Sequence, residues 1–536
     1  MFEHILLLLL LPAFVFSATD LQTACNGIDR IYSGGSCLVL NKTAVKYSKA
    51  KVSCEHYLGY SGHLVFIRSV TVQNTLKQLI TSNSVTGVYV GYEQTNATGL
   101  RNANWAYAYK NGSTITASFL PWKTGYPLTI TSYDRAYFSA SGVIDAAGES
   151  LTFAFVCEYE ESLKQAVTDL EKQCAAVSQV HVYNNGHCYV WHDERVNYFA
   201  AKLSCQEIPE INGHVIHIRN AEQVQMVETI LKAGSLRPFT WVGLEQTNVS
   251  AADTQQLGSW FYSTPQESDE MATFLPWHQG EPNNGATGQY ADYSLNNHGL
   301  RDDPATAANG FICEYESSRP MTTDLERLCN STGVDADLLN VATPDGHCYI
   351  MHTTMVFADV AKLSCNALPG YNGHLVHIRS ESQIGIVESL MSANSFTAFA
   401  WVGMEHTNKS GNRSIGWYYT TPEDSNELAS FLPWSSDRPS TYDNFNNVLY
   451  YVKDTGSGSS MNGIFDYPNN NNFKYICEYD CAVNSAWTAW SACSQSCDKG
   501  IRSRGVTYKI PSNCGSPTTP TPVYYYESCA TGVQCK

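Results

Sequence analysis

The apolar and polar positions follow a pattern that recurs three times along the chain. Residues 200–205 and 222–231 place apolar side chains at helical spacing, and so do residues 383–391. Short aromatic strands, separated by loops rich in glycine and asparagine, continue up to a final Phe-Ile-Cys-Glu strand at 311–314. A Gly-His-apolar-apolar-x-Ile-Arg strand pattern occurs at 62–68, 213–219 and 373–379. The pattern predicts an α+β fold in which two helices lie beside small antiparallel sheets, with a long irregular loop region in each repeat.

The cysteines repeat with the same period as the apolar pattern. In each unit one cysteine is followed 17 residues later by a second and, near the end of the unit, by a Cys-Glu-Tyr triplet, at Cys37/Cys54/Cys157, Cys188/Cys205/Cys313 and Cys348/Cys365/Cys477. A Thr-Asp-Leu triplet opens each unit, and short polar connectors at 160–172 and 316–328 join the units. We therefore predict three tandem modules at residues 19–160, 161–318 and 319–480. Loops that differ from copy to copy on a shared scaffold indicate recognition rather than catalysis.

The first residues are typical of a secretory signal. An apolar run from Ile5 to Phe16 ends in the small residues Ser17 and Ala18, so residues 1–18 are predicted to be a cleaved signal peptide. No other segment is long and apolar enough to predict a membrane span. The eighteen cysteines, an even number, fit a secreted protein stabilised by crosslinks. We expect a soluble, extracellular product.

Length, charge and glycosylation signals narrow the picture further. At 536 residues the chain exceeds what one hydrophobic core organises, which agrees with several domains. The formal net charge of −17 argues against nucleic acid or an anionic membrane as the main partner. Asn-x-Ser/Thr sequons, which predict N-glycosylation in the secretory pathway, stand at Asn41, Asn96, Asn111, Asn248, Asn330, Asn408 and Asn412.

At these residues the modules resemble C-type lectin-like domains. The resemblance rests on the early helical cysteine, the terminal Cys-Glu, and a Pro-Trp pair before the long loop. It rests also on a Trp-Val-Gly-Leu-Glu box at 241–245, with variants at 89–93 and 401–405. It covers residues 19 to 480 and implies three lectin-like domains. It also implies the disulfides Cys25–Cys37, Cys54–Cys157, Cys174–Cys188, Cys205–Cys313, Cys329–Cys348 and Cys365–Cys477.

In sugar-binding members of this family, Ca²⁺ is held by a Glu-Pro-Asn run, a following Glu and an Asn-Asp pair, and the sugar hydroxyls complete its shell. The second module has the mannose-type run Glu281-Pro282-Asn283. Carboxylate and amide oxygens that project from a turn suit calcium, which takes oxygen ligands. The resemblance therefore implies Ca²⁺ as a cofactor of this module alone, with Glu281, Asn283 and Asp302 as principal ligands.

The rest of that site departs from the family pattern. Gln289 stands where the family has the following Glu, and the Asn-Asp pair becomes Arg301-Asp302. Fewer carboxylates and an arginine beside the ion predict weak binding. A one-residue slip, disfavoured because Asp302-x-Pro matches Asp466-x-Pro in the third module, would supply Asp303 as a ligand. A solvated loop without metal is the alternative.

The other two modules distinguish the structural residues of this loop from the candidate calcium ligands. At the position of Glu-Pro-Asn the first module has Tyr126-Pro127-Leu128, and the third has Arg438-Pro439-Ser440. The proline recurs where the calcium ligands do not, so we interpret it as structural, in a cis turn that the family often uses. No metal is expected at this position in the first and third modules.

Other residue patterns fit structural roles. His63, His214 and His374 recur in the strand pattern, joined by His217 and His377, and suggest zinc. Without a matching Cys/His set we interpret them as structural. The aromatic boxes at 119–122, 274–277 and 431–434 are expected to anchor the core or the loop. The sequence contains no nucleophile elbow, phosphate loop or paired-metal motif, so we expect no enzyme.

Residues 481–536 form a separate, cysteine-rich segment. It contains six cysteines, a Trp487-x-x-Trp490 pair and Arg502-x-Arg504, and it is too small to fold without crosslinks. It resembles a thrombospondin type 1 repeat, in which Trp and Arg side chains stack. The resemblance implies the disulfides Cys481–Cys514, Cys493–Cys529 and Cys497–Cys535, C-mannosylation at Trp487 or Trp490, and O-fucosylation at Ser496.

The sequence thus predicts a secreted, non-enzymatic recognition protein. The leading hypothesis is calcium-assisted carbohydrate binding through the second module, with microbial or host surface glycans or glycoproteins as partners, as in host defence and innate immunity. The alternative is an extracellular matrix or adhesion protein that binds protein partners independently of calcium. A coat component crosslinked through its cysteines ranks last, because all eighteen cysteines can pair internally.

Overall fold

The computed structural model describes most of the chain after the predicted signal peptide. Side chains are described up to Asp480, and beyond it the backbone of four strand segments. The described residues are 18–96, 102–165, 167–234, 237–246, 260–265, 268, 270–284, 288–321, 323–332, 338–343, 346–368, 371–394, 397–407, 413, 415–422, 427–435, 438–442, 444–452, 462–484, 499–506, 508–509 and 523–530.

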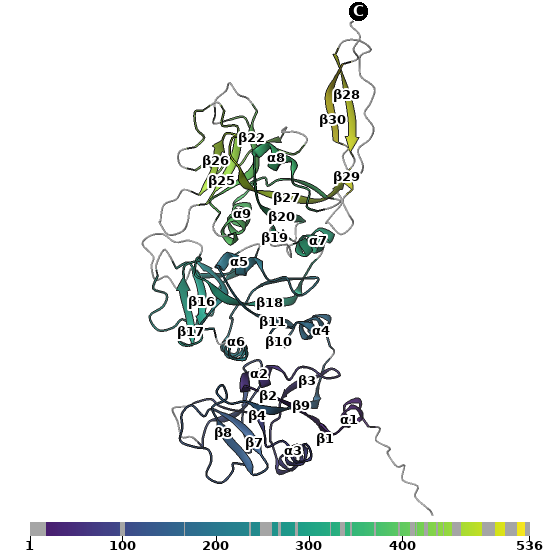
Figure 1. Ribbon diagram of the computed structural model, residues 1–536, viewed down its shortest axis with the longest axis vertical. Coiled ribbons are helices and arrows are strands. Elements are labelled where there is room, and N and C mark those ends of the chain that lie inside the picture. Colours follow the sequence, from purple (N-terminus) through teal and green to yellow (C-terminus); the bar gives the residue numbers. More distant parts are fainter. Residues whose placement is uncertain are drawn as a thin grey trace, which may run out of the picture. The chain divides into compact units, whose positions relative to one another are not determined.

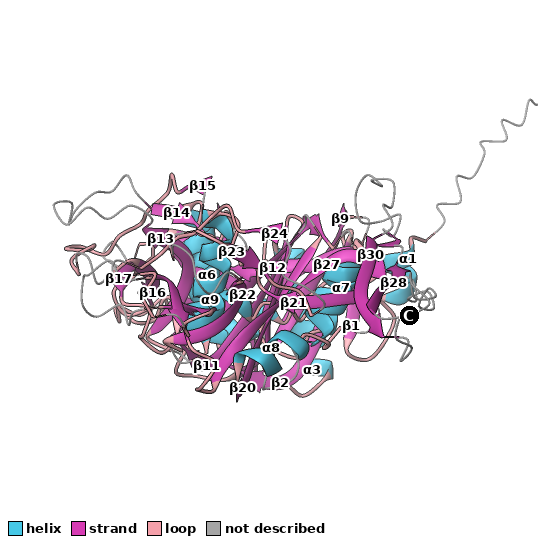
Figure 2. Cartoon of the chain, turned by 90° about the horizontal axis from the view of Figure 1, so that it is seen from above, coloured by secondary structure: helices cyan, strands magenta, loops and turns pink. Residues whose placement is uncertain are grey.

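Contacts divide the chain into two units. One comprises Met1–Thr168 with Ala221–Ser235, and the other Asp169–Asn220 with Leu236–Lys536. Three sheets with the same strand order follow one another along the sequence, as Figure 1 shows by colour. The helices beside them are short and strands predominate (Figure 2). The mixed α and β architecture predicted from the apolar pattern is confirmed.

The first module has nine strands, with the main path β1-β2-β9-β4-β5-β6. Strand β3 pairs with β9, and the hairpin β7–β8 pairs with β4. The elements are α1 (Asp20–Ala24), β1 (Arg30–Ser33), β2 (Ser36–Val45), α2 (Tyr47–Val52), β3 (Tyr60–Leu64), α3 (Val70–Ser82), β4 (Gly87–Gln94), β5 (Trp105–Ala108), β6 (Thr114–Thr116), β7 (Arg135–Ser139), β8 (Gly142–Ala146) and β9 (Phe153–Lys164).

The second module repeats this order as β10-β11-β18-β13-β14-β15, with β12 on β18 and the hairpin β16–β17 on β13. Its elements are α4 (Asp169–Ala176), β10 (His181–Asn184), β11 (His187–Val196), α5 (Tyr198–Leu203), β12 (Ile211–Val215), α6 (Ala221–Ala233), β13 (Phe239–Gln246), β14 (Trp260–Tyr262), β15 (Glu270–Met271), β16 (Tyr290–Ser294), β17 (Gly299–Asp303) and β18 (Asn309–Pro320).

The third module follows as β19-β20-β27-β22-β23-β24, with β21 on β27 and the hairpin β25–β26 on β22. In the C-terminal segment β28 pairs with β30. The elements are α7 (Asp324–Thr332), β19 (Leu338–Thr343), β20 (His347–Val356), α8 (Ala358–Leu363), β21 (Tyr371–Leu375), α9 (Glu381–Ala393), β22 (Phe399–His406), β23 (Trp417–Tyr419), β24 (Glu427–Leu428), β25 (Asn447–Tyr451), β26 (Gly463–Tyr467), β27 (Phe473–Asn484), β28 (Lys499–Val506), β29 (Tyr508–Lys509) and β30 (Val523–Ala530).

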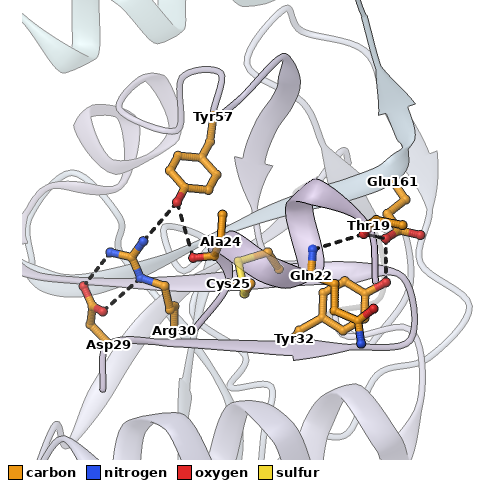
Figure 3. The surroundings of a disulfide bond; sticks show 10 residues. Thr19, Gln22, Ala24, Cys25, Asp29, Arg30, Tyr32, Tyr57 and Glu161 are labelled. Carbon is orange, nitrogen blue, oxygen red and sulfur yellow. Dashed lines mark hydrogen bonds and ion pairs between the residues drawn. A yellow bond between two sulfur atoms is a disulfide. The ribbon is translucent and has the colours of Figure 1, made fainter. Parts of the chain in front are cut away.

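A third short helix opens each module, in addition to the two predicted helices. It begins at the Thr-Asp-Leu triplet, because the threonine caps it: the Gln22 amide donates to the Thr19 hydroxyl at 3.1 Å (Figure 3). In the third module Thr323 and Glu326 cap each other reciprocally, at 2.8 and 3.1 Å. The triplet that the sequence presents as a module boundary is therefore a helix start.

Six disulfides hold the three modules, two in each. One joins the first helix to the second strand, as Cys25–Cys37 does in the first module (Figure 3). The other joins the second helical segment to the long terminal strand, as in Cys54–Cys157. The remaining four are Cys174–Cys188, Cys205–Cys313, Cys329–Cys348 and Cys365–Cys477. These are the six pairs that the resemblance to lectin-like domains implies.

The terminal strand of each module runs further than the predicted module boundaries. Strands β9, β18 and β27 end at Lys164, Pro320 and Asn484, whereas the sequence places boundaries after residues 160, 318 and 480. The extension has partners, because Tyr60 pairs with Lys164 and Ile211 with Pro320. The polar connectors predicted at 160–172 and 316–328 are therefore largely strand and helix.

The Pro-Trp boxes anchor the long loop to the core, as predicted. In every module the box tryptophan packs edge-on against the tryptophan of a neighbouring strand, with ring centroids 4.9 Å apart. In the second module this pair is Trp277 and Trp260. The Trp277 backbone also bridges to Leu300 of β17. These contacts fix the start of the loop that carries Glu281.

Candidate functional site

The candidate site lies where the loop after Trp277 meets strand β17. A cis peptide bond joins Glu281 to Pro282. Beyond it, the Asn283 and Asn284 amides each donate to one carboxylate oxygen of Asp302, both at 2.7 Å. Asp302 is 2% exposed, so its charge is compensated largely by these two bonds. The carboxylate therefore holds the loop in place.

The corresponding aspartate of the other modules also binds the loop, through a single backbone amide. Asp145 accepts from the Leu128 amide with both oxygens at 3.0 Å, and Asp466 accepts from the Ser440 amide at 2.9 and 3.0 Å. Each peptide bond before the recurring proline is cis. The aspartate and the proline therefore serve the loop whether or not calcium ligands are present.

Glu281 distinguishes the second module. Its Oε2 atom is buried and has no hydrogen-bond partner among the described residues. Burial and the neighbouring carboxylate of Asp302 raise the pKa of Glu281 above its ordinary value. Two carboxylates that face each other without a bridging donor favour either a proton or a cation between them. With the exposed Asn283 amide beside them, the donors are oxygens of the kind that calcium takes.

The guanidinium of Arg301 is paired with carboxylates other than Glu281 and Asp302. Its guanidinium donates to both oxygens of buried Asp292, at 3.1 and 2.7 Å, and contacts Asp303 at 3.4 Å. It also lies over the Phe239 ring, 3.8 Å from the centroid. Because successive side chains of a strand point to opposite faces, Arg301 and Asp303 lie on the face of β17 opposite to Asp302. The penalty expected from an arginine next to the ion is therefore reduced.

Gln289 and Asp303 have different places. The Gln289 backbone carbonyl accepts from the Gln246 amide at 2.8 Å, which ties the far end of the loop to β13. Asp303 is committed to Arg301. The hairpin register is the same in all modules, since Asp302 pairs with Ala291 as Asp466 does with Val448. The unslipped alignment is thus the one observed.

A glycine missed in the sequence shapes the same site. A Cβ atom at Gly288 would lie 2.4 Å from Asp302 Oδ2, closer than Cβ atoms approach their neighbours in proteins. The chain must therefore carry glycine where it passes over the carboxylate. The sequence shows this feature only as a glycine immediately before Gln289. It does not show that the glycine passes over Asp302, which is distant in sequence.

The third module fills the corresponding space with positive charge. Arg438, at the position of Glu281, donates to Asp466 Oδ1 at 3.3 Å, and Arg413 donates to Oδ2 at 3.3 Å. Asp466 is fully buried. Two guanidinium groups occupy the surroundings of this carboxylate, and a divalent cation would meet repulsion there. In the first module Tyr126 and Leu128 stand at the two ligand positions, so no second carboxylate is present.

The predicted modification sites are only partly described. Asn41 and Asn96 are exposed, and Asn111 and Asn330 are partly exposed. Several further predictions lie outside the described residues or side chains: glycosylation at Asn248, Asn408, Asn412, Trp487, Trp490 and Ser496, residues 1–17 of the predicted signal peptide 1–18, and the disulfides Cys481–Cys514, Cys493–Cys529 and Cys497–Cys535, of which only the backbones of Cys481 and Cys529 are described.

Comparison with known families decides the nature of the second module. The Lectin C-type domain family matches residues 194–315. The second module is a C-type lectin domain. The Thrombospondin type 1 domain family matches residues 485–535, so the chain also contains a thrombospondin type 1 domain. Both are non-catalytic families.

Individual relatives are similar to parts of the chain. A "C-type lectin mannose-binding isoform" of Notechis scutatus scutatus is 28% identical over 135 residues, which are 24% of this chain and 77% of that protein. Human lithostathine is 18% identical, with a TM-score of 0.23, and matches 28% of this chain and 99% of its own. The carbohydrate-recognition domain of mouse scavenger receptor C-type lectin is 21% identical, with a TM-score of 0.20, and matches 25% and 95%.

Within the described part of the chain, no helix is both long and apolar enough to cross a bilayer.

Proposed function

We propose that the protein is a secreted, non-enzymatic recognition protein whose C-type lectin domain binds carbohydrate through a Ca²⁺ ion. The ion would be held by Glu281, Asn283 and Asp302, with Gln289 as a further oxygen donor. The observation that carries the proposal is the buried, unpartnered Glu281 Oε2 beside the Asp302 carboxylate. A cation between them removes the repulsion that raises the pKa of Glu281.

The residues present fit calcium. Two carboxylates and one or two amide oxygens give a hard-oxygen donor set, and a bound ion would leave positions for water or for sugar hydroxyls. Glu281 and Asn283 can also accept from and donate to those hydroxyls. With one carboxylate fewer than the family pattern, the site is expected to be weak, so that clustered glycans would be bound by avidity.

Other features support a role outside the cell. Six disulfides within the three modules are typical of secreted proteins. The predicted signal peptide and the exposed sequons at Asn41 and Asn96 agree with secretion. We assign the first and third modules to the same lectin-like class because they share the strand order of the second. We propose surface glycans of microbes or hosts as the targets, as in host defence.

Binding of the full-length protein to immobilised mannan tests the proposal. We expect retention in millimolar calcium, elution by a chelator or by free mannose, and loss of retention in Glu281→Gln. A matched control is Glu270→Gln, which removes an exposed carboxylate that pairs with Arg219 in the same domain. It should bind as the wild type does.

The opposite result has a clear meaning. Retention that survives the chelator and Glu281→Gln would contradict a calcium lectin. It would favour the alternative of a matrix or adhesion protein that recognises its partners without calcium.

A further inference from the structure

A cluster of two histidines and two carboxylates spans three strands of the second module. Strand β18 pairs with β11 on one side and with β12 on the other. In this register His187 stands opposite Glu316, and His214 stands opposite Glu314. Glu314 and Glu316 are two residues apart in one strand, so they share a face. Four potential metal ligands therefore lie on one side of the sheet.

The ligand atoms lie at distances that suit one small ion. His187 Nδ1 is 2.8 Å from Glu314 Oε1 and 3.7 Å from Glu316 Oε1, and His214 Nε2 is 3.8 Å from Glu316 Oε1. Zinc binds nitrogen and oxygen at about 2.0–2.1 Å, so neighbouring ligand atoms of a tetrahedral site lie about 3.3 Å apart. The observed separations bracket that value, and the His187 and His214 rings would have to move toward one point to bind the same ion.

His214 is oriented as a metal-binding histidine is. Its Nδ1–H donates to the Val215 carbonyl at 2.9 Å, which leaves the lone pair on Nε2. That Nε2 atom is buried and has no hydrogen-bond partner in the described part of the chain, and the residue is 1% exposed. A buried imidazole whose other nitrogen is fixed by a carbonyl is the usual arrangement of a metal ligand.

The neighbouring His217 is not part of the ligand set. Its Nε2 donates to the Ser263 carbonyl at 2.8 Å, and its Nδ1 accepts from Arg219 at 3.1 Å. Its ring stacks on that of His214, with centroids 4.0 Å apart. It therefore packs behind the cluster.

The third module carries the same four positions. His347 pairs with Asp480 and His374 with Glu478 in the strand register. His347 Nδ1 is 3.2 Å from Glu478 Oε1 and 2.9 Å from Asp480 Oδ1, and His374 Nε2 is 3.5 Å from Asp480 Oδ2. His374 Nδ1 donates to the Leu375 carbonyl at 2.8 Å. The tautomer and the ligand spacing of the second module are thus repeated.

The first module lacks one of the two histidines, and its two carboxylates are paired with an arginine. Ser36 stands where the first histidine would be, opposite Glu160. Arg68 donates to Glu158 at 3.1 Å and to Glu160 at 2.5 Å. His63 also contacts Glu160, at 3.0 Å. With an arginine between the carboxylates, this cluster is neutralised without metal.

The same arginine points elsewhere in the other two modules. Arg219 pairs with Glu270 at 2.6 Å, and Arg379 pairs with Glu427 at 2.9 Å. Arg319 approaches the second oxygen of Glu316 at 3.5 Å, while Oε1 faces the histidines. In these two clusters the inner carboxylate, Glu314 or Glu478, accepts from backbone amides and lies beside a histidine ring, where Glu158 of the first module has an arginine.

We propose that the second and third modules each bind a Zn²⁺ ion, through His187, His214, Glu314 and Glu316 and through His347, His374, Glu478 and Asp480. Two imidazoles and two carboxylates in a closed tetrahedral arrangement select zinc over calcium. On binding, His187 Nδ1 gives up the proton that it shares with Glu314 and donates its lone pair to the ion. The ion crosslinks three strands next to the disulfide at Cys313.

The test uses the full-length protein, stripped with a chelator and titrated with ZnCl₂ in millimolar calcium. Saturating calcium keeps the Glu281 site out of the measurement, so the result does not depend on the proposed lectin function. We expect two Zn²⁺ per chain by calorimetry, one each in His187→Gln and His347→Gln, and none at the same affinity in the double variant. Loss of a direct ligand should weaken its site by at least about 10–100-fold.

Two controls keep the test decisive. His63→Gln in the first module should leave the stoichiometry at two, and Co²⁺ should give the visible absorption of a four-coordinate site in wild type but not in the double variant. His187 and His347 are partly exposed, so the variants should fold, which far-UV circular dichroism checks. Absence of saturable zinc binding, or zinc binding that the double variant retains, would overturn the proposal.

Discussion

Replacing Asp302 by asparagine should release the loop that carries Glu281. The carboxylate accepts from the Asn283 and Asn284 amides, each at 2.7 Å. Asparagine keeps one carbonyl acceptor and places an NH₂ donor against the second amide. One charge-assisted hydrogen bond is lost, at a cost of about 1.5–3 kcal/mol to local opening. At 1.4 kcal/mol for each factor of ten, the two amides should exchange about 10–150 times faster.

Hydrogen–deuterium exchange of the calcium-free, full-length protein measures this directly. Asp303→Asn is the matched control, because Asp303 contacts Arg301 and lies on the opposite face of β17. It should leave exchange at residues 283 and 284 unchanged. Equal exchange in Asp302→Asn and wild type would refute the claim that this carboxylate positions the loop, and equal acceleration by Asp303→Asn would show a general loss of packing.

Three further predictions concern buried charges. Because burial and the neighbouring carboxylate raise the pKa of Glu281, protons should compete with the ion, and calcium affinity measured by calorimetry should fall as the pH falls through that pKa. Burial lowers the pKa of His352 to about 4, so the third module should lose up to about 3 kcal/mol between pH 6.5 and 4. His352→Phe, which keeps the stacking on Tyr475, should remove that loss in denaturant unfolding followed by hydrogen exchange. Glu93→Gln leaves Lys51 buried without its partner at 2.8 Å and should cost the first module about 3–5 kcal/mol in the same assay.

His192 provides the contrast for His352. It stacks on Phe311 as His352 stacks on Tyr475, but its Nε2 lies 2.9 Å from Glu207. Burial acts to lower the pKa of His192, but the hydrogen bond and the charge of Glu207 have the larger effect. The pKa of His192 is therefore raised above its ordinary value. The stabilisation that His192 provides is therefore present in acid and is lost as the pH rises. The variant His192→Phe should have a lower free energy of unfolding in acid than the wild type. Equal pH profiles for His192→Phe and His352→Phe would contradict this account.

The scaffold could be predicted because its signals are local or repeated. The cysteine spacing, the apolar period and the Pro-Trp box occur three times, and their agreement fixes the module. The short first helices were missed although Thr323 and Glu326 form a capping box in the sequence. The triplet was interpreted as a boundary, and its helix-capping chemistry was overlooked.

The site residues could be named, but their partners could not. Asp302 binds backbone amides, which every residue except proline has, so the sequence gives no sign of them. The partner of Arg301 is Asp292 on the adjacent strand, and only the hairpin register brings the two together. The sequence singles out His214 and His374, but it does not show their partners, because Glu314 and Glu316 face the histidines across neighbouring strands.

The most direct test of the central claim is calcium titration of the full-length protein by calorimetry, wild type against Glu281→Gln. The account predicts one saturable calcium site in the C-type lectin domain that disappears in the variant, with Glu270→Gln behaving as wild type. Absence of binding at millimolar calcium, or a site that Glu281→Gln retains, would contradict it.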